Sequence, residues 1–242
     1  MKAFSVMALL LIFGIGASFK LVKTDVDGAW RMTDASGKTV MLTIIDNYLM
    51  QTTYEPTRFV STRGGACQRS GDALTLTVEF DSQDSSRVGQ SESYKLGLRS
   101  GQLTLTSQAG AKTFTRVDEP SSQTPLAGLW RITGRANDAG QLTAMQRGAR
   151  KTIKLLTGSR FQWAAINPQT KQFSGTGGGT YTFTDGKYTE TIDFFSRDNS
   201  RVGRSLTFTD KVNGSEWTHT GQSSTGGQVN EIWTREPTET TR

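Results

Sequence analysis

The chain contains an internal duplication, and this limits its possible folds more than any other sequence feature. The segment GAWRMT at 28–33 returns as GLWRIT at 128–133, and FDSQDSSRVGQS, starting at Phe80, returns as FFSRDNSRVGRS, starting at Phe194. The offset of the second pair, 194 − 80 = 114, also carries the glycines at 64–65 onto those at 178–179. Because the matches run through the whole of each copy, the chain is two copies of one domain in tandem.

Each copy has the residue pattern of a β-domain. Apolar and polar side chains alternate through 40–44 and 74–80, which is the period of a strand with one buried face. Asp185-Gly186 has the composition of a two-residue hairpin turn. We therefore expect an all-β protein of two tandem small antiparallel β-barrels, since closure leaves no edge strand exposed. The expected domains are 24–119 and 126–237, joined by a polar linker that contains two prolines.

A family resemblance adds to this prediction. Each copy begins with Gly-x-Trp and has an Arg late on its last expected strand. These residues are Gly28, Trp30 and Arg116 in the first copy, and Gly128, Trp130 and Arg235 in the second. The pattern resembles the lipocalin or calycin type of barrel, and the second copy also looks like a group of uncharacterised bacterial secreted lipocalin-like proteins. The resemblance implies that each Arg packs across its Trp at the closed end, a structural role, and that the first loop of a copy covers the open mouth.

The N-terminus has the features of an export signal. An apolar run at 3–17 follows Lys2 and ends among small residues, so we expect a signal peptide at 1–19 and a secreted or periplasmic protein. The alternative is an uncleaved anchor, but the run is shorter than the roughly 20 residues that span a bilayer. We therefore expect no transmembrane span after cleavage.

The composition argues against several functional classes. The net charge of +6 is dispersed, and no nucleic-acid-binding motif accompanies it. The single cysteine, Cys67, cannot form a disulfide within the chain, and a small buried thiol is the expected role. With one His and one Cys, the chain is poorly suited to nucleophilic triads and to His-rich metal sites, so no cofactor or metal is expected.

Differences between the copies indicate where a function specific to one copy lies. The alignment places Glu190 where the first copy has Leu76, and it places His219, the only histidine, where the first copy has Leu105. A carboxylate inside an apolar barrel needs a donor, a water or a ligand, or must stay protonated. Further replacements enlarge the aromatic surface: Leu74 to Tyr188, Leu103 to Trp217, Cys67 to Tyr181, Met50 to Trp163 and Phe114 to Trp233, with Lys112 roughly matching Glu231.

The predicted ligand site is accordingly the interior of the second barrel. Its residues are Glu190, His219, Trp163, Tyr181, Tyr188, Trp217, Trp233 and Glu231, the mostly aromatic composition of a small-molecule pocket. In the alternative, the barrel is filled and Glu190 and His219 satisfy each other. An insertion of 13 residues within 137–150 would form a lid or a plain surface excursion.

We expect a binding protein for a small amphipathic or aromatic ligand, with the first, Leu-rich barrel as a structural or docking module. The runner-up function is a cell-envelope interaction or scaffold module with both barrels filled and a protein partner bound by outer loops. A third hypothesis is an enzyme with Glu190 as general base and His219 as acid, which requires the two within hydrogen-bond reach.

Overall fold

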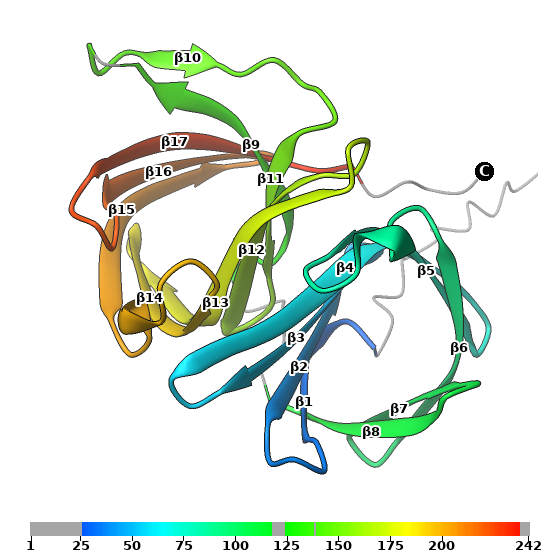
Figure 1. Cartoon of the computed structure of the whole chain (residues 1–242). Coiled ribbons are helices and arrows are strands. Elements are labelled where there is room, and N and C mark those ends of the chain that lie inside the picture. The colour runs from blue at the N-terminus through cyan, green and yellow to red at the C-terminus, as the bar shows by residue number, and fades with distance from the viewer. Residues whose placement is uncertain (1–25, 118–123, 138, 238–242) are drawn as a thin grey trace, which may run out of the picture.

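The computed structural model describes residues 26–117, 124–137 and 139–237, which form two closed eight-stranded antiparallel β-barrels in tandem (Figure 1). The predicted all-β class and the duplication are thereby confirmed. The expected signal peptide at 1–19 and most of the expected linker, 118–123, lie outside the described residues. No helix in the described ranges is long and apolar enough to cross a membrane.

The first barrel is an up-and-down meander closed by pairing of its first and last strands. Its strands are β1 (Gly28–Thr33), β2 (Thr39–Ile45), β3 (Tyr48–Glu55), β4 (Arg58–Ser70), β5 (Ala73–Asp81), β6 (Ser91–Arg99), β7 (Gln102–Ser107) and β8 (Gly110–Arg116). The alternating residues of β5 point inward as expected, because Leu74, Leu76 and Val78 are all buried in one core cluster.

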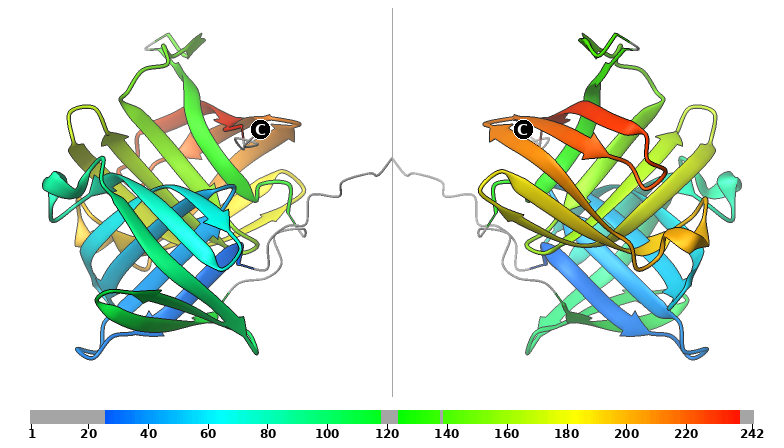
Figure 2. Two further views of the ribbon diagram at one scale, coloured as in Figure 1. Left: turned by 90° about the vertical axis from the view of Figure 1, so that its right-hand side faces the viewer. Right: turned by 90° about the vertical axis from the view of Figure 1, so that its left-hand side faces the viewer.

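The second barrel repeats this topology and adds one outer strand. Its strands are β9 (Gly128–Ala136), β11 (Lys151–Leu156), β12 (Arg160–Asn167), β13 (Gln172–Thr184), β14 (Lys187–Phe195), β15 (Ser205–Asn213), β16 (Glu216–Gln222) and β17 (Gln228–Arg235). Pairing of β9 with β17 closes the barrel. The extra strand β10 (Leu142–Ala144) pairs only with the outer end of β9, and this hairpin projects beyond the barrel (Figures 1 and 2).

Local sequence accounts for the bends and turns that close the barrels. Asp185 and Gly186 both have positive φ, at 50° and 75°, in the hairpin between β13 and β14. The paired glycines at 64–65 and 178–179 stand at register shifts in β4 and β13. A Cβ at Gly65 or Gly179 would lie 1.9 Å from a backbone oxygen of the next strand, so only glycine fits where these long strands fold over.

The Trp and Arg of each copy stack at one end of its barrel. The guanidinium carbon of Arg116 lies 4.1 Å from the ring centroid of Trp30, and that of Arg235 lies 4.2 Å from Trp130. Each indole N–H donates to the carbonyl four residues earlier, in Val26 or Leu126. These residues close the barrel in the same way in both copies, which is the structural role expected of them.

The two barrels pack against each other through a shared interface. Gln162 on β12 donates its amide to Thr62 and Thr176, both at 3.1 Å, and accepts from Thr52 at 3.0 Å. All four side chains are at most 2% exposed. A cluster of apolar residues from both barrels surrounds them: Ile45, Tyr48, Met50, Phe80, Leu129, Ile153, Leu155, Ala164 and Ile166. The outer faces of β3, β4 and β12 are therefore buried, although the sequence suggested no contact between the barrels.

Candidate functional site

A cavity of about 370 Å³ opens within the second barrel. Five of the eight predicted ligand residues line it: Trp163, Glu190, His219, Glu231 and Trp233. The other three, Tyr181, Tyr188 and Trp217, are buried in the aromatic core that surrounds Trp130. The structure thus brings the whole predicted set into one barrel but divides it between the wall of a cavity and a filled core.

Glu190 is paired with Lys154, a residue that the sequence comparison did not identify. Lys154 Nζ lies 3.2 Å from Glu190 Oε2, and their side chains are 4% and 10% exposed. The ammonium also lies 4.8 Å from the ring centroid of Tyr188, 4.9 Å from that of Phe161 and 5.2 Å from that of Trp217. Three aromatic faces and one carboxylate therefore hold this cation inside the barrel.

Burial and the neighbouring carboxylate also act on the hydroxyl of Tyr188. This hydroxyl lies 3.2 Å from Glu190 Oε2 and donates to it. Desolvation first, and then the negative charge of Glu190, hold the pKa of Tyr188 well above its usual value. Tyr188 therefore remains a neutral hydrogen-bond donor to the ion pair over the physiological pH range.

His219 has a different buried partner, Asp210 on β15. His219 Nδ1 lies 2.9 Å from Asp210 Oδ1, while Asp210 Oδ2 accepts from the indole N–H of Trp217 at 2.9 Å. His219 itself lines the cavity, and its other ring nitrogen, Nε2, has no hydrogen-bond partner in the described part of the chain. No hydrogen bond joins Glu190 to His219 in the described part of the chain, so the two do not satisfy each other as the filled-core alternative required.

Glu231 is the second carboxylate on the cavity wall, and it is paired with Arg135. Its carboxylate lies 3.1 Å from a guanidinium nitrogen of Arg135 and accepts from the indole N–H of Trp233 at 3.1 Å. Arg150 and Arg197 add two further cations to the lining. The apolar and aromatic part of the wall comes from Phe161, Ile192, Phe195, Leu206, Phe208 and Val229. A cavity of this size and composition suits a small molecule with an apolar body and a few polar groups.

Strand pairing gives the structural equivalents of these charged residues in the first barrel. Trp30 pairs with Leu42 where Trp130 pairs with Lys154, and the other equivalences follow the offset of 114 along β14 to β16. The residues Lys154, Glu190, Asp210 and His219 stand in place of Leu42, Leu76, Leu96 and Leu105. Four buried leucines thus build the same fold without any of these charges.

Two of the sequence equivalences require correction. The insertion is 12 residues long, because Trp130 and Lys154 are 24 apart whereas Trp30 and Leu42 are 12 apart. The predicted length of 13 residues aligned Lys38-Thr39 with Lys151-Thr152, which places β11 one residue out of register. Such a shift exchanges the inward and outward faces of a strand, and for this reason Lys154 was not recognised as an inward residue. By the same register, Trp163 corresponds to Gln51, whereas Met50 corresponds to Gln162 of the interface. Asp210 could have been found from the offset of 114, which places it on Leu96.

The insertion does not cover the cavity. It forms the β9–β10 hairpin, in which Leu142 is 43% exposed, and Met145 beyond it is 42% exposed. Arg135 and Arg150, at the two ends of the excursion, line the cavity, but no residue described between them does. The structure therefore favours a surface excursion over a lid.

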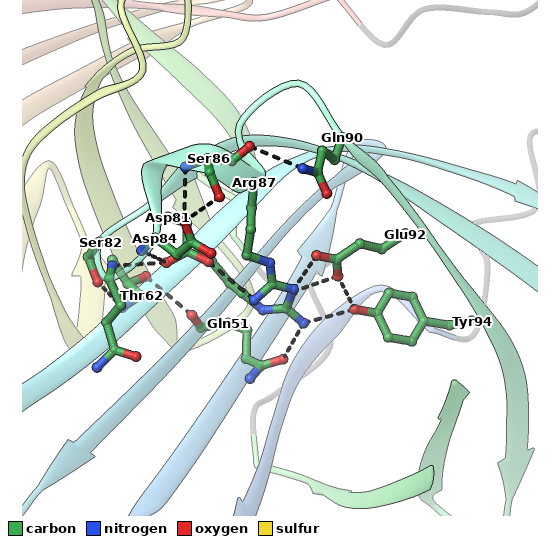
Figure 3. A network of polar contacts seen from close by, with 12 residues as sticks. Gln51, Thr62, Asp81, Ser82, Asp84, Ser86, Arg87, Gln90, Glu92 and Tyr94 are labelled. Atoms are coloured by element: carbon green, nitrogen blue, oxygen red, sulfur yellow. Dashed lines mark hydrogen bonds and ion pairs between the residues drawn. The ribbon is translucent and has the colours of Figure 1, made fainter. Parts of the chain in front are cut away.

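A second and larger cavity, of about 780 Å³, lies at the mouth of the first barrel. Leucines fill the lower part of this barrel, but its mouth carries a polar network that the sequence comparison did not identify (Figure 3). Arg63 donates to Glu92 at 2.6 Å and to the hydroxyl of Tyr94 at 2.8 Å, and Arg87 contacts both Glu92 and Asp81. Burial alone would raise the pKa of Glu92, but hydrogen bonds from Tyr94, Arg63 and Arg87 outweigh it, so this pKa lies below its usual value.

In the described ranges, no group of three or more His, Cys, Asp or Glu side chains is arranged to hold a metal ion. A scan against protein-family models finds no match to the chain, and a search of curated proteins finds none either.

Proposed function

We propose that the second barrel binds a small amphipathic or aromatic molecule and that the chain is an exported, lipocalin-like binding protein. The observation that carries this proposal is the joint replacement of four core leucines by Lys154, Glu190, Asp210 and His219. Buried charges cost stability relative to a well-packed apolar core, and the first barrel closes without them. Their retention beside a cavity therefore points to recognition.

The ligand would meet hydrogen-bonding groups that the protein leaves unused. In the described part of the chain, Glu190 Oε1 and His219 Nε2 have no hydrogen-bond partner, and Lys154 uses one of its three donors. Buried polar groups are rarely left unmatched, and these three side chains all line the cavity. The aromatic faces of Trp163, Phe208 and Trp233 would hold the apolar body of the ligand.

The test compares ligand binding with and without the ion pair. Native mass spectrometry of the protein from its own cells would reveal a small-molecule adduct, and N-phenyl-1-naphthylamine serves as an uncharged aromatic probe in fluorescence titrations. We expect the double variant Lys154→Leu/Glu190→Leu, which restores the residues of the first barrel, to fold but to lose the cellular adduct. A folded double variant that retains the adduct, or a wild-type protein that yields no adduct and binds no probe, would refute the proposal.

The lipocalin-like kinship rests on the Trp and Arg pairs, which stack at matching ends of both barrels. Export rests on the apolar N-terminal run alone. Cell fractionation together with the mass of the processed N-terminus tests it, and an intact Met1 in the cytoplasmic fraction would be the contrary result.

One observation favours the alternative function, an envelope interaction module. The β9–β10 hairpin has no counterpart in the first barrel and exposes Leu142, with Met145 exposed just beyond β10. If this excursion binds a protein partner, Leu142→Ser/Met145→Ser should abolish cross-linking to that partner and leave probe binding unchanged. The acid and base hypothesis has less support, because Glu190 and His219 each have another partner.

A further inference from the structure

The cavities of the two barrels differ in polarity at five equivalent positions. Five residues of the first cavity have equivalents, by strand register, that line the second cavity. The pairs are Gln51 and Trp163, Arg63 and Gly177, Asp81 and Phe195, Glu92 and Leu206, and Tyr94 and Phe208. The five residues of the first barrel are all polar or charged. None of their equivalents in the second barrel is charged, and the indole N–H of Trp163 is the one polar side-chain group among them. Deeper in each barrel the difference is reversed, because the first barrel has leucines at the positions where the second has Lys154, Glu190 and His219. The second cavity keeps charged residues elsewhere in its lining, so the two cavities differ in where their polar groups lie.

The network at the mouth of the first barrel has more donors than it uses. Glu92 accepts from Arg63, Arg87 and Tyr94. Asp81 forms an ion pair with Arg87 and accepts from two backbone N–H groups, so both carboxylates are well supplied. A guanidinium has five N–H donors, and among the described residues neither arginine has partners for all five. Lys112 adds an ammonium to the same cavity, which leaves its charged lining with three cations and two anions.

The remaining lining is rich in uncharged hydrogen-bonding groups. It includes four amide side chains and four hydroxyl side chains: Gln51, Gln83, Gln90, Gln108, Ser61, Ser91, Ser93 and Ser107. Amides and hydroxyls both donate and accept, so they match a ligand that carries several hydroxyl groups. The volume of about 780 Å³ lies within the range of about 300–1000 Å³ that small-molecule pockets occupy.

We infer that the first barrel is a second, independent binding site, which takes a polyhydroxylated organic acid of the sugar-acid type. The acid group would engage Arg63, Arg87 and Lys112, whose charges exceed those of the two carboxylates beside them. The hydroxyl groups of the ligand would exchange hydrogen bonds with the amide and hydroxyl lining. This site does not depend on the proposed function of the second barrel.

The test uses D-glucuronate as the probe and D-glucose as its uncharged counterpart, with saturation-transfer NMR and calorimetry on the full chain. We expect glucuronate to bind about tenfold more tightly than glucose, the effect of one charge-assisted contact worth about 1.4 kcal/mol. Arg63→Gln should weaken glucuronate binding by a similar factor. Lys112→Gln should also weaken it, and because Lys112 is exposed this second variant does not depend on the network for folding.

The matched control is Lys154→Leu/Glu190→Leu, which changes only the second barrel and should leave glucuronate binding unchanged. Absence of saturation transfer to glucuronate would overturn the inference. Equal binding of glucuronate and glucose that survives both Arg63→Gln and Lys112→Gln would also overturn it. If the control variant lost glucuronate binding, the ligand would be in the second barrel and the assignment to the first would be wrong.

Discussion

Lys154 and Glu190 occupy positions that Leu42 and Leu76 fill in the first barrel, so one molecule offers both versions of the same core. An ion pair out of water gains attraction but loses hydration, and well-packed apolar residues often replace it at no cost. Removal of one partner is different, because the remaining charge stays buried and uncompensated.

We therefore predict that replacing one residue of this pair destabilises the protein, whereas replacing both does not. Lys154→Leu should lower the free energy of unfolding by about 3–5 kcal/mol, since it leaves the Glu190 carboxylate buried with only the Tyr188 hydroxyl as a donor. For Lys154→Leu/Glu190→Leu, the free energy of unfolding should lie within about 1 kcal/mol of the wild-type value or above it. Urea titrations followed by tryptophan fluorescence measure both. Equal destabilisation of the single and double variants would show that the pair itself holds the barrel together.

Cys67 provides a probe of the first barrel and a pH-dependent prediction. Burial raises the pKa of its thiol to about 12. An unfolded thiol ionises near pH 8.5, so between these values the unfolded chain binds fewer protons and stability falls as the pH rises. We expect a thiol reagent at pH 8 to label Cys67 only after the first barrel unfolds in urea. Rapid labelling of the native protein would contradict the buried position of this residue.

The sequence predicted Glu190 and His219 as inward residues because their strands follow one offset. It did not predict Lys154, since the insertion before β11 leaves the register open and a shift of one residue exchanges the two faces of a strand. The filled-barrel alternative paired these two residues with each other, whereas their partners are Lys154 and Asp210, because pairing across a barrel depends on closure and not on sequence separation.

At the scale of elements, the long strands β4 and β13 fold over at the paired glycines. Gly65 and Gly179 admit no side chain, since a Cβ would lie 1.9 Å from the backbone oxygen of Thr77 or Thr191. The repeated glycines mark this bend in both copies, and the sequence predicted the hairpin at Asp185 from turn chemistry. It did not predict that the insertion leaves the cavity uncovered, because the path of a loop is set by contacts along its whole length.

We predict that Gly65→Ala disrupts the bend in β4 and lowers the free energy of unfolding by about 1–3 kcal/mol or more, the usual cost of overpacking. Gly97→Ala is the control in the same barrel, because the nearest atom to its new Cβ would be 3.7 Å away. Urea dependence of Cys67 labelling reports on both variants. Equal labelling curves for the two would mean that β4 can bend without the glycine.

At the scale of the whole molecule, the interface between the barrels was not predicted. Thr52, Thr62, Gln162 and Thr176 stand on the outward faces of their strands, where polar residues ordinarily meet water. Only the structure shows that they hydrogen-bond to one another with at most 2% exposure and that apolar residues surround them. The duplication accounts for the fold of each half and for the equivalence of Thr62 and Thr176, but it does not predict the contact, in which Gln162 of the second barrel stands where the first has Met50.

The buried interface predicts that the two barrels stabilise each other. Gln162→Ala removes three hydrogen bonds and leaves a void between the barrels, so we expect a loss of about 2 kcal/mol. Although Gln162 belongs to the second barrel, Cys67 in the first should become labelled at a lower urea concentration, together with the fluorescence change of the second. Gln228→Ala, which removes an exposed glutamine from the same barrel, should change neither signal. If Gln162→Ala shifted only the fluorescence of the second barrel, the barrels would be energetically independent, and each ligand site could be studied as the property of a separate domain.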